Sequence, residues 1–437
     1  NYINMKNCDL IIKGKYVLTM DNKMSAFNDG FVAVNGGEII EIGAREILEK
    51  YNSKKIINAG SSIIMPGMIN THTHAAMAYF RGIADDLPLI TWLEKHIRPA
   101  ESKYANKSFI KKSSELACLE MIKSGITCFN DMYFFEEETA RAAAQAGMRA
   151  CVGEAVLDFP TPSCKNSQET LKKTEEMILK YKNSELISVA AAPHSIYVCS
   201  KENLIKAKEL ADKYSVNLHI HISETKKENE DCLRDNKKSP VKYLDELGIL
   251  DNKTIAAHNI WLDGADIEIY KNRQVKISHC PISNMKLATG VMNFKKMNES
   301  GVIISLGTDG AASNNTLDLF SDMRVCALLA KINNLNPEIA SAPEIVKIAT
   351  INGAKTLGMN NKIGSLEIGK KADIITINLD KPHLLPIYNP YSHLVCAVNS
   401  SDVENVIING KLVMQNRKVF GLDEEKILKE ANGFIKK

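Results

Sequence analysis

The chain has 437 residues, more than one compact domain usually contains, so we expect two or three domains or one large barrel with an accessory domain. The composition is that of an ordinary globular protein, with 45% hydrophobic and 24% charged residues. The formal net charge is +3 and no long run of Lys or Arg occurs, so neither nucleic acid nor an acidic membrane surface is expected as a partner.

The ten cysteines are scattered along the chain, without any CxxC pair. Nothing that resembles a secretory signal precedes them, and reduced thiols in a cytoplasmic protein are therefore expected. No apolar stretch reaches the roughly 18 residues that a membrane span requires, and no membrane association is expected.

The two ends of the chain show the same strand-like pattern of β-favouring runs broken by Gly, Asn and Asp. The runs are residues 8–21, 29–43, 54–67, 370–380 and 403–416. We expect strands from both ends to pair in one small β-sandwich domain, built from residues 1–65 and 370–437. Residues 66–369 would then form a continuous insertion.

The inserted region alternates short apolar runs with segments of good helix formers. Eight apolar runs occur, at residues 67–74, 125–132, 148–156, 187–195, 216–223, 253–259, 274–280 and 301–310. Alternating β and α segments predict parallel strands joined by crossover helices, and eight such units predict a (β/α)8 TIM-like barrel, an α/β fold. A doubly wound open sheet is the alternative, but no GxGxxG follows any of the runs.

Polar residues gather where these apolar runs end. From the first run to the eighth they are His72, His74, His194, His221, Glu224, His258, His279 and Asp309. Barrel enzymes place their catalytic groups at the carboxyl ends of the strands. We therefore expect these side chains to share one mouth of the barrel.

This set of residues predicts a metal centre. Residues i and i+2 of a strand face the same way, so His72 and His74 can bind one ion. Barrel closure brings the eighth strand beside the first and carries Asp309 to the pair, while His221 reaches across from the fifth strand. Three imidazoles and one carboxylate suit Zn²⁺ or Fe²⁺ better than Ca²⁺ or Mg²⁺. One divalent ion is expected, with Zn²⁺ favoured and Fe²⁺ as the alternative.

Neighbouring residues have more than one interpretation. His219 should lie one layer deeper than the ligands, which favours packing or support of a ligand. Glu224 is predicted as a general acid and base beside the metal-activated water, with a helix-start carboxylate as the alternative. His258 can be a ligand, a group that polarises the substrate or a hydrogen-bonded core residue. For His279, a functional and a purely structural role are equally open. His194 has the same alternatives as His258.

With these residues assembled, the chain resembles the amidohydrolase superfamily over nearly its full length. The resemblance rests on PGMINTHTH, LHIHISET, AAHN and LGTDGAASNN. Within the superfamily it is most similar to adenosine-type deaminases that act on 5'-methylthioadenosine and S-adenosylhomocysteine. That closer similarity rests on FRGIADDLPLITWLEKHIRPAE, DMYFFEE, APHSIYVCS and GTDGAASNN.

The resemblance implies metal-dependent hydrolytic deamination of 5'-modified adenosines to the inosine analogues and ammonia. The implied substrates are 5'-methylthioadenosine and 5'-deoxyadenosine, then S-adenosylhomocysteine and adenosine. A homo-oligomer, either a dimer or a tetramer, is expected by analogy with the family.

The resemblance also implies a role for each matching residue. The implied metal ligands are His72, His74, His221 and Asp309. The implied catalytic residues are Glu224, His258 and Asp309. The implied substrate contacts are Glu101, which would bind the ribose, and His194, Glu224 and Trp92. For Trp92, a buried aromatic on a helix is the alternative to a place beside the 5' substituent.

One segment departs from the family pattern. In relatives that bind a homocysteine tail, arginines after the third strand hold its amino-acid group, whereas this chain has Glu154 where an arginine is expected. A carboxylate there would repel another carboxylate. We therefore expect a preference for uncharged 5' groups.

Two other functions compete with this hypothesis. The first is another amidohydrolase reaction, on a free base or a triazine, such as guanine, cytosine or pterin deamination or triazine hydrolysis. Glu101 and His194 favour a nucleoside, because a free base has no ribose for a carboxylate to bind. The second is a non-catalytic scaffold barrel, which the complete set of metal ligands disfavours. The HxE and PCxxC signature of other zinc base deaminases is absent.

Overall fold

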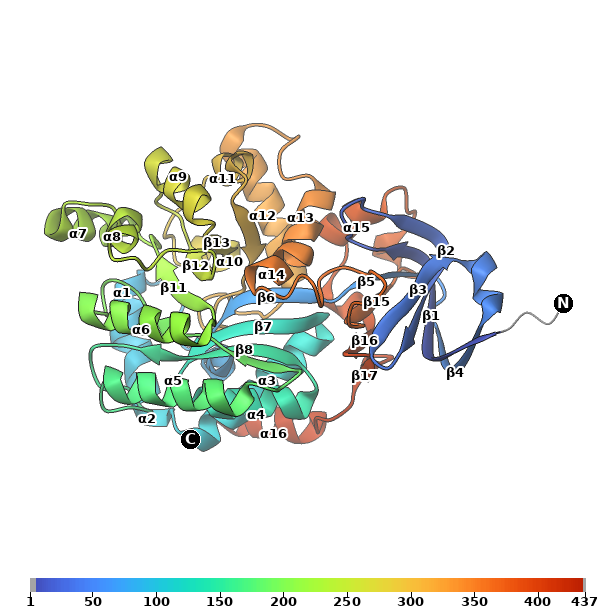
Figure 1. Ribbon diagram of the computed structural model, residues 1–437, viewed down its shortest axis with the longest axis horizontal. Coiled ribbons are helices and arrows are strands. Elements are labelled where there is room, and N and C mark those ends of the chain that lie inside the picture. Colours follow the sequence, from blue (N-terminus) through green and yellow to red (C-terminus); the bar gives the residue numbers. More distant parts are fainter. Residues whose placement is uncertain (1–4, 435–437) are drawn as a thin grey trace.

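Strands from both ends of the chain form one nine-stranded sheet, at the right of Figure 1. The computed structural model describes residues 5–434. The strands of this sheet are β1 (Lys6–Leu18), β2 (Ala26–Asn35), β3 (Glu38–Ala44), β4 (Tyr51–Asn58), β5 (Ser62–Pro66), β15 (Ile374–Asn378), β16 (Val403–Ile408), β17 (Lys411–Gln415) and β18 (Lys418–Val419). The two halves meet where β5 pairs antiparallel with β15.

The terminal sheet surrounds a core of its own. Ile12 of β1, Val32 of β2, Ile64 of β5 and Ile374 of β15 are all fully buried in one cluster. Gly36 and Gly37 have φ of +59° and +85°, and they close β2 and β3 in the two-residue turn that such hairpins favour. The prediction that strands from both ends pair with one another is confirmed. Hydrogen bonds join all nine strands into a single sheet, however, and not into the two separate sheets of a sandwich.

The eight predicted apolar runs form parallel strands in the middle of the molecule (Figure 1). These strands are β6 (Met68–Thr73), β7 (Ile126–Tyr133), β8 (Arg149–Val156), β9 (Ile187–Val189) continued by β10 (Ala192–Pro193), β11 (Leu218–Ile222), β12 (Thr254–His258), β13 (Lys276–His279) and β14 (Ile303–Leu306). One parallel group contains β6 to β10 and another contains β11 to β14.

Two connections join these parallel groups. A parallel bridge between Ser195 and His221 connects the segment after β10 with β11. On the other side, the Asp309 N–H after β14 donates to the His72 carbonyl of β6 over 3.0 Å. The first and eighth strands are therefore neighbours, and the arrangement fits a TIM-like barrel.

Helices between the strands cover the outside of the central strands. They are α3 (Lys107–Lys123), α4 (Glu136–Ala146), α5 (Ser167–Tyr181), α6 (Lys201–Tyr214), α7 (Lys226–Asn236), α8 (Pro240–Glu246), α9 (Gly264–Arg273), α10 (Pro281–Lys286), α11 (Phe294–Ser300), α12 (Leu319–Asn334), α13 (Ala342–Ala349) and α14 (Ile351–Thr356). Side chains of Asn106, Asn166, Ser200 and Thr225 accept the third backbone N–H of the helix that each precedes, which fixes where these helices begin.

Four further helices lie outside this alternation. α1 (Leu89–Trp92) and α2 (Arg98–Tyr104) follow β6 and precede α3. α15 (Pro390–Cys396) packs against α12 and α13, and α16 (Glu424–Phe434) packs against α3. The C-terminal segment therefore contacts both the terminal sheet and the helices around the central strands.

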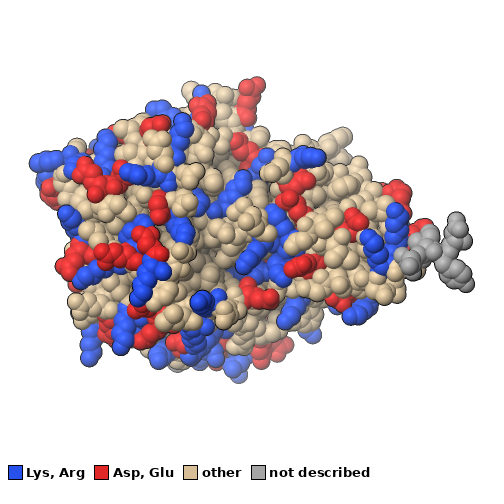
Figure 2. Space-filling model, in the orientation of Figure 1, with Lys and Arg blue, Asp and Glu red and all other residues tan. Residues whose placement is uncertain are grey.

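The surface and the cysteines agree with the composition. On the face in Figure 2, basic and acidic side chains are interspersed, as the small net charge suggests. All ten cysteines are unpaired, and Cys396 alone among them is exposed. Within residues 5–434, no helix has the length and apolar character needed to cross a membrane.

A buried ion pair joins the central strands to the terminal sheet. Arg149, at the start of β8, donates through Nε to Asp373 Oδ2 over 2.6 Å and through Nη2 to Asp373 Oδ1 over 3.1 Å. The two side chains are only 5% and 2% exposed. Arg149 is the first residue of β8, and Asp373 directly precedes β15. The ion pair therefore holds the start of β8 against the start of β15.

Replacement of Arg149 by Met is expected to lower the free energy of unfolding by about 3–5 kcal/mol, because the Asp373 charge would stay buried without a partner. Urea denaturation of both proteins measures the difference. The matched control is Arg234→Met, whose side chain is 64% exposed, with an expected change within about 0.5 kcal/mol. Equal losses in the two variants would contradict the anchoring role of Arg149.

Candidate metal centre and substrate cavity

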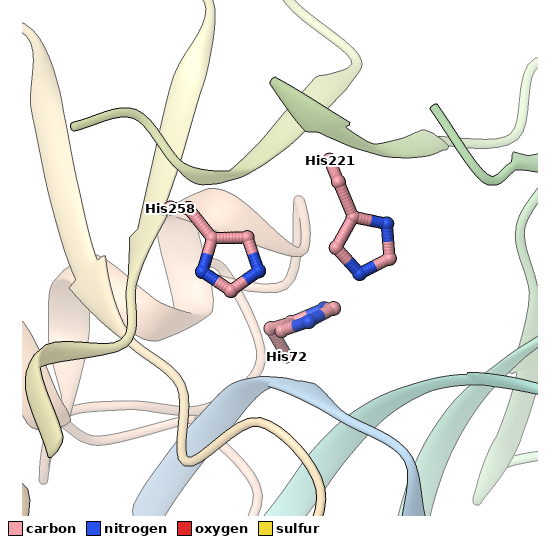
Figure 3. A group of neighbouring side chains, drawn as sticks. All are labelled: His72, His221 and His258. Atoms are coloured by element: carbon pink, nitrogen blue, oxygen red, sulfur yellow. The ribbon is translucent and has the colours of Figure 1, made fainter. Parts of the chain in front are cut away.

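The histidines at the strand ends converge on one point. Figure 3 shows the rings of His72, His221 and His258 turned toward one another, with ring centroids 4.7 Å apart for His72 and His221 and 5.3 Å apart for His221 and His258. Asp309, after β14, lies beside the first strand. Its Oδ1 is 3.4 Å from His72 Nε2 and 3.2 Å from His74 Nε2. The five side chains therefore share one centre.

The donor atoms of this cluster fit a divalent metal. His72 Nε2 is buried and, although Asp309 Oδ1 lies 3.4 Å away, it forms no hydrogen bond within residues 5–434. Such orphaned buried atoms are rare in proteins. Two overlapping triads bring their donor atoms within 4.8 Å of one another: His72 with His74 and Asp309, and His72 with His221 and His258. Imidazole nitrogens with one carboxylate are ligands that suit Zn²⁺ or Fe²⁺.

Contacts behind the cluster orient the three rings of the predicted ligands. They are His72 Nδ1 to His219 Nε2 (2.8 Å), His74 Nδ1 to the Met132 carbonyl (2.5 Å) and His221 Nδ1 to the His194 carbonyl (2.7 Å). Each contact occupies Nδ1 and leaves Nε2 for the centre, as is usual for histidines that bind metals. The structure places His219 behind His72, one layer deeper in the protein.

Burial and the Asp309 charge shift the pKa values of the cluster in opposite directions. Burial lowers the pKa of His72 to about 4 and holds the pKa of His221 well below its usual value, so both rings are neutral. Burial also disfavours the charge of His74, but the hydrogen bond and charge of Asp309 outweigh it and raise the pKa of His74 to about 9. The two histidines in turn keep the pKa of Asp309 well below its usual range against the effect of burial.

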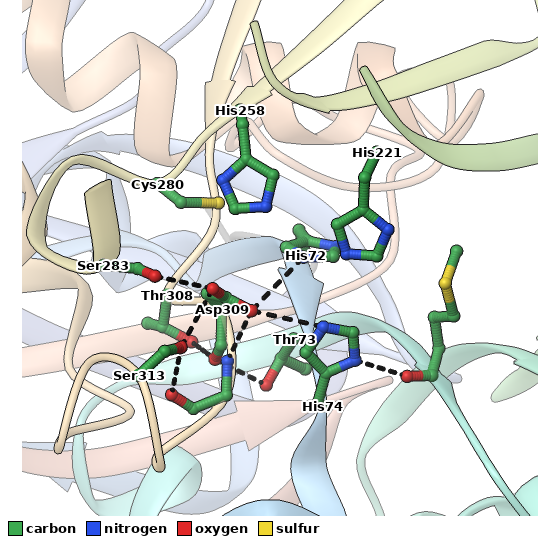
Figure 4. A network of polar contacts seen from close by, with 12 residues as sticks. His72, Thr73, His74, His221, His258, Cys280, Ser283, Thr308, Asp309 and Ser313 are labelled. Atoms are coloured by element: carbon green, nitrogen blue, oxygen red, sulfur yellow. Dashed lines mark hydrogen bonds and ion pairs between the residues drawn. The ribbon is translucent and has the colours of Figure 1, made fainter. Parts of the chain in front are cut away.

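Three donors hold the Asp309 carboxylate (Figure 4). Oδ2 accepts hydrogen bonds from Ser283 Oγ over 2.6 Å and Ser313 Oγ over 2.9 Å, and Oδ1 accepts from the Gly310 N–H over 2.8 Å. The sequence prediction missed both serines. The sequence offered one hint of their role: Ser283 follows shortly after His279, and Ser313 follows shortly after Asp309.

Glu224 lies next to the cluster and faces His258. Its Oε1 is 3.9 Å from His258 Nε2, and burial raises the pKa of its carboxyl group. Glu228 fixes the turn, because its carboxylate accepts the backbone N–H of Ser223 and of Glu224 over 3.0 and 2.8 Å. His258 Nδ1 contacts Asn284 Oδ1 over 2.9 Å, a contact that the sequence prediction also missed.

A cavity of about 590 Å³ opens from this cluster. His74, His221, His258 and Asp309 form part of its wall. The residues predicted to contact substrate line the same cavity: Trp92, Glu101, His194 and Glu224. His72 lies beneath the wall and is fully buried, whereas His279 is buried outside the lining.

Trp92 and Glu101 reach the cavity from the helical segment after β6. Trp92, in α1, is 5% exposed, and its indole N–H is buried without a partner within residues 5–434. Glu101, in α2, is 8% exposed and accepts a hydrogen bond from the Tyr133 hydroxyl over 2.7 Å. Trp92 is therefore a buried aromatic that also borders the cavity, and its place beside the 5' substituent stays a prediction.

Residues 63–413 match the Amidohydrolase family. The chain belongs to the amidohydrolase family. A 5-methylthioadenosine/S-adenosylhomocysteine deaminase from Thermodesulfovibrio yellowstonii is 47% identical over 424 residues, which cover 96% of this chain and 97% of the relative. A 5'-deoxyadenosine deaminase from Methanosarcina acetivorans is 44% identical over 425 residues, which cover 97% of this chain and 96% of the relative. The family resemblance is thus confirmed.

Solved structures agree with the assignment of this chain to the amidohydrolase family. An adenosine deaminase from Xanthomonas campestris with bound zinc superposes with a TM-score of 0.97, at 33% identity and with 99% of each chain covered. An atrazine chlorohydrolase from Arthrobacter aurescens superposes with a TM-score of 0.90 at 22% identity, covering 98% of this chain and 100% of the other, and shares the fold.

In this amidohydrolase, Glu154 does not reach the cavity. Its carboxylate accepts the backbone N–H of Phe135 over 3.0 Å and of Glu136 over 2.9 Å, and it also bonds the Ser163 hydroxyl. It therefore holds the turn after β7 in place. The expectation that Glu154 repels a substrate carboxylate is wrong, because the side chain is 2% exposed and points into this turn.

The Glu101 carboxyl group gives the amidohydrolase a pH-dependent stability. Burial raises its pKa to about 7, against the usual 4.5, despite the hydrogen bond from Tyr133. The folded state therefore holds a proton that the unfolded chain releases. The contribution of Glu101 to stability is complete below about pH 4.5 and is lost as the pH rises to about 7.

The free energy of unfolding of Glu101→Gln is therefore expected to rise relative to that of the native protein as the pH increases. The difference between the two should grow by about 2–3 kcal/mol from pH 5 to pH 8, because the amide needs no proton to stay neutral. Urea denaturation of metal-free protein at several pH values measures this gain. The control is Glu94→Gln, an exposed residue of the same segment, which should show no such trend. A gain that does not vary with pH would contradict the prediction.

Proposed function

We propose that this amidohydrolase removes the 6-amino group of 5'-modified adenosines by hydrolysis, giving the inosine analogue and ammonia. One observation carries the proposal: a single cavity joins the His and Asp cluster to the buried Glu101 carboxylate and to His194. Such a cavity can hold a purine at the cluster and a ribose beside a carboxylate. The relatives at 47% and 44% identity bear the names of deaminases for such nucleosides.

One divalent ion, Zn²⁺ or Fe²⁺, would bind to His72, His74, His221 and Asp309. The neutral rings of His72 and His221, the ionised Asp309 and the orphaned His72 Nε2 support this assignment. When bound, the ion lowers the pKa of a water molecule and so supplies a nucleophile at neutral pH.

The protein residues around the nucleophile move the protons. Glu224 takes a proton from the attacking water and gives it to N1 of the purine, which makes C6 more electrophilic. His258, 3.9 Å from Glu224, stabilises the charge that develops on the attacking oxygen. After the addition, Glu224 takes the proton of the hydroxyl group added at C6 and passes it to the amino group, which leaves as ammonia. Its raised pKa makes Glu224 a better donor in this step than Asp309, whose pKa is held low.

The rest of the cavity binds the nucleoside. Glu101 accepts hydrogen bonds from the ribose hydroxyls, and His194 and Trp92 line the same space. The proposed domains are a closed (β/α)8 barrel over residues 66–369 and a small domain over 1–65 and 370–437. The pairing of β5 with β15 and the neighbouring β6 and β14 support this division.

The test is ammonia release from a panel of 5'-methylthioadenosine, 5'-deoxyadenosine, S-adenosylhomocysteine, adenosine, adenine, guanine, cytosine and a chlorotriazine. Deamination of the nucleosides, with free bases and the triazine at least about tenfold poorer in kcat/KM, is expected, because only a nucleoside brings a ribose to Glu101. Faster hydrolysis of a free base or triazine would overturn the proposal. Stoichiometric metal without any hydrolysis would favour a scaffold.

A further inference from the structure

Arg98 is the one cationic Lys or Arg side chain among the described residues that line the substrate cavity. It begins α2, three residues before Glu101, so the two side chains lie on the same side of the helix. Its guanidinium lies over the ring of Phe159, with Cζ 5.2 Å from the ring centroid. Exposure rises from Glu101 at 8% to Phe159 at 38%, which places Arg98 toward the outer end of the cavity.

No carboxylate of the described chain neutralises Arg98. Within residues 5–434, no Asp or Glu oxygen forms an ion pair with its guanidinium, whereas Arg81, Arg149 and Arg273 each pair with a carboxylate. The nearby Glu101 carboxyl group is bonded to Tyr133 instead. The Arg98 guanidinium, a cation with five N–H donors, therefore borders the cavity without an ion-pair partner within residues 5–434.

We propose that Arg98 forms an anion subsite for a carboxylate or phosphate carried on the 5' substituent of the nucleoside. The inference rests on the proposed function and narrows its substrate class. Residues three apart on a helix are neighbours, about 5–6 Å apart at Cβ, so Arg98 and Glu101 can contact adjoining parts of one nucleoside. A planar guanidinium can bind either anion through two parallel hydrogen bonds.

The test compares wild-type enzyme with Arg98→Gln, both loaded with metal, on three nucleosides. S-adenosylhomocysteine carries a carboxylate, adenosine 5'-monophosphate carries a phosphate, and 5'-methylthioadenosine carries neither. Arg98→Gln is expected to lower kcat/KM for an anionic substrate by about 10–100-fold and for 5'-methylthioadenosine by less than about threefold. A selective loss on S-adenosylhomocysteine identifies a carboxylate subsite, and a selective loss on the monophosphate identifies a phosphate subsite.

Calorimetric dissociation constants for the same three nucleosides separate this inference from the proposed function. If none is deaminated, the proposed function fails, while the ratio of dissociation constants still tests the subsite. Arg98→Lys, which keeps the charge but loses the planar donors, should show an intermediate loss. Arg273→Gln, on the surface of α9, is the matched control and should leave the substrate ratios unchanged. Equal changes on all three nucleosides in Arg98→Gln, or no change, would overturn the subsite.

Discussion

Replacement of Glu224 by Gln is expected to reduce kcat by at least about 10³-fold while metal content stays at the wild-type level. A single general acid or base typically supplies about 10²–10⁴-fold, and Glu224 is proposed to act in more than one proton transfer. The amide has the same shape, so the turn held by Glu228 and the cavity wall should persist. Ammonia release measures kcat, and atomic emission spectroscopy measures the bound metal.

The control for this variant is Glu230→Gln on the exposed surface of α7, where the side chain is 62% exposed. Its kcat should stay within about twofold of wild type, since it lies away from the cavity. Near-normal turnover in Glu224→Gln would remove Glu224 from proton transfer. Loss of metal in the same variant would instead make it part of the ligand set.

Removal of the metal by chelation is expected to lower activity below about 1% of the loaded enzyme, because the residues at the centre cannot by themselves generate hydroxide at neutral pH. Chelation should also lower the free energy of unfolding, by about 4 kcal/mol relative to protein with free metal at a thousand times its dissociation constant. Thermal denaturation with and without added Zn²⁺ or Fe²⁺ measures the second effect, and readdition of each ion identifies the one that restores turnover.

Metal affinity should rise with pH in this experiment. His74 has a pKa of about 9 in the metal-free protein, so an incoming ion must displace its proton. His74→Ala is expected to fail to retain one ion per chain after desalting. The matched control is His383→Ala, which lies outside the cluster and contacts Asp402, and this variant should keep its metal. Full activity after exhaustive chelation would contradict a metal-dependent reaction.

The sequence located the cluster because simple periodicity and strand order governed it. His72 and His74 face one way through the two-residue repeat of a strand, and Asp309 joins them because the eighth strand neighbours the first. Ser283, Ser313 and Asn284 escaped prediction because their contacts arise in loops and short helices, where no repeat fixes the direction of a side chain.

The error at Glu154 has a similar physical origin. Every residue of β8 is buried, so no alternation of polar and apolar residues reveals which face looks toward the cavity. Arg98 was overlooked because the sequence does not show which side of the helical segment 89–104 borders the cavity. The single terminal sheet was also beyond the local pattern, because strand-like runs do not specify whether neighbouring strands join one ladder or two.

The pairing of β5 with β15 has a consequence for synthesis on the ribosome. β5 ends at Pro66, and β6, which carries His72, begins at Met68, so the strand that leads into the metal site is anchored by residues 374–378. A nascent chain therefore cannot complete this anchor until more than four-fifths of the polypeptide has been translated. Contacts so distant in sequence fold slowly, and metal capture should be one of the last events in the maturation of each new chain.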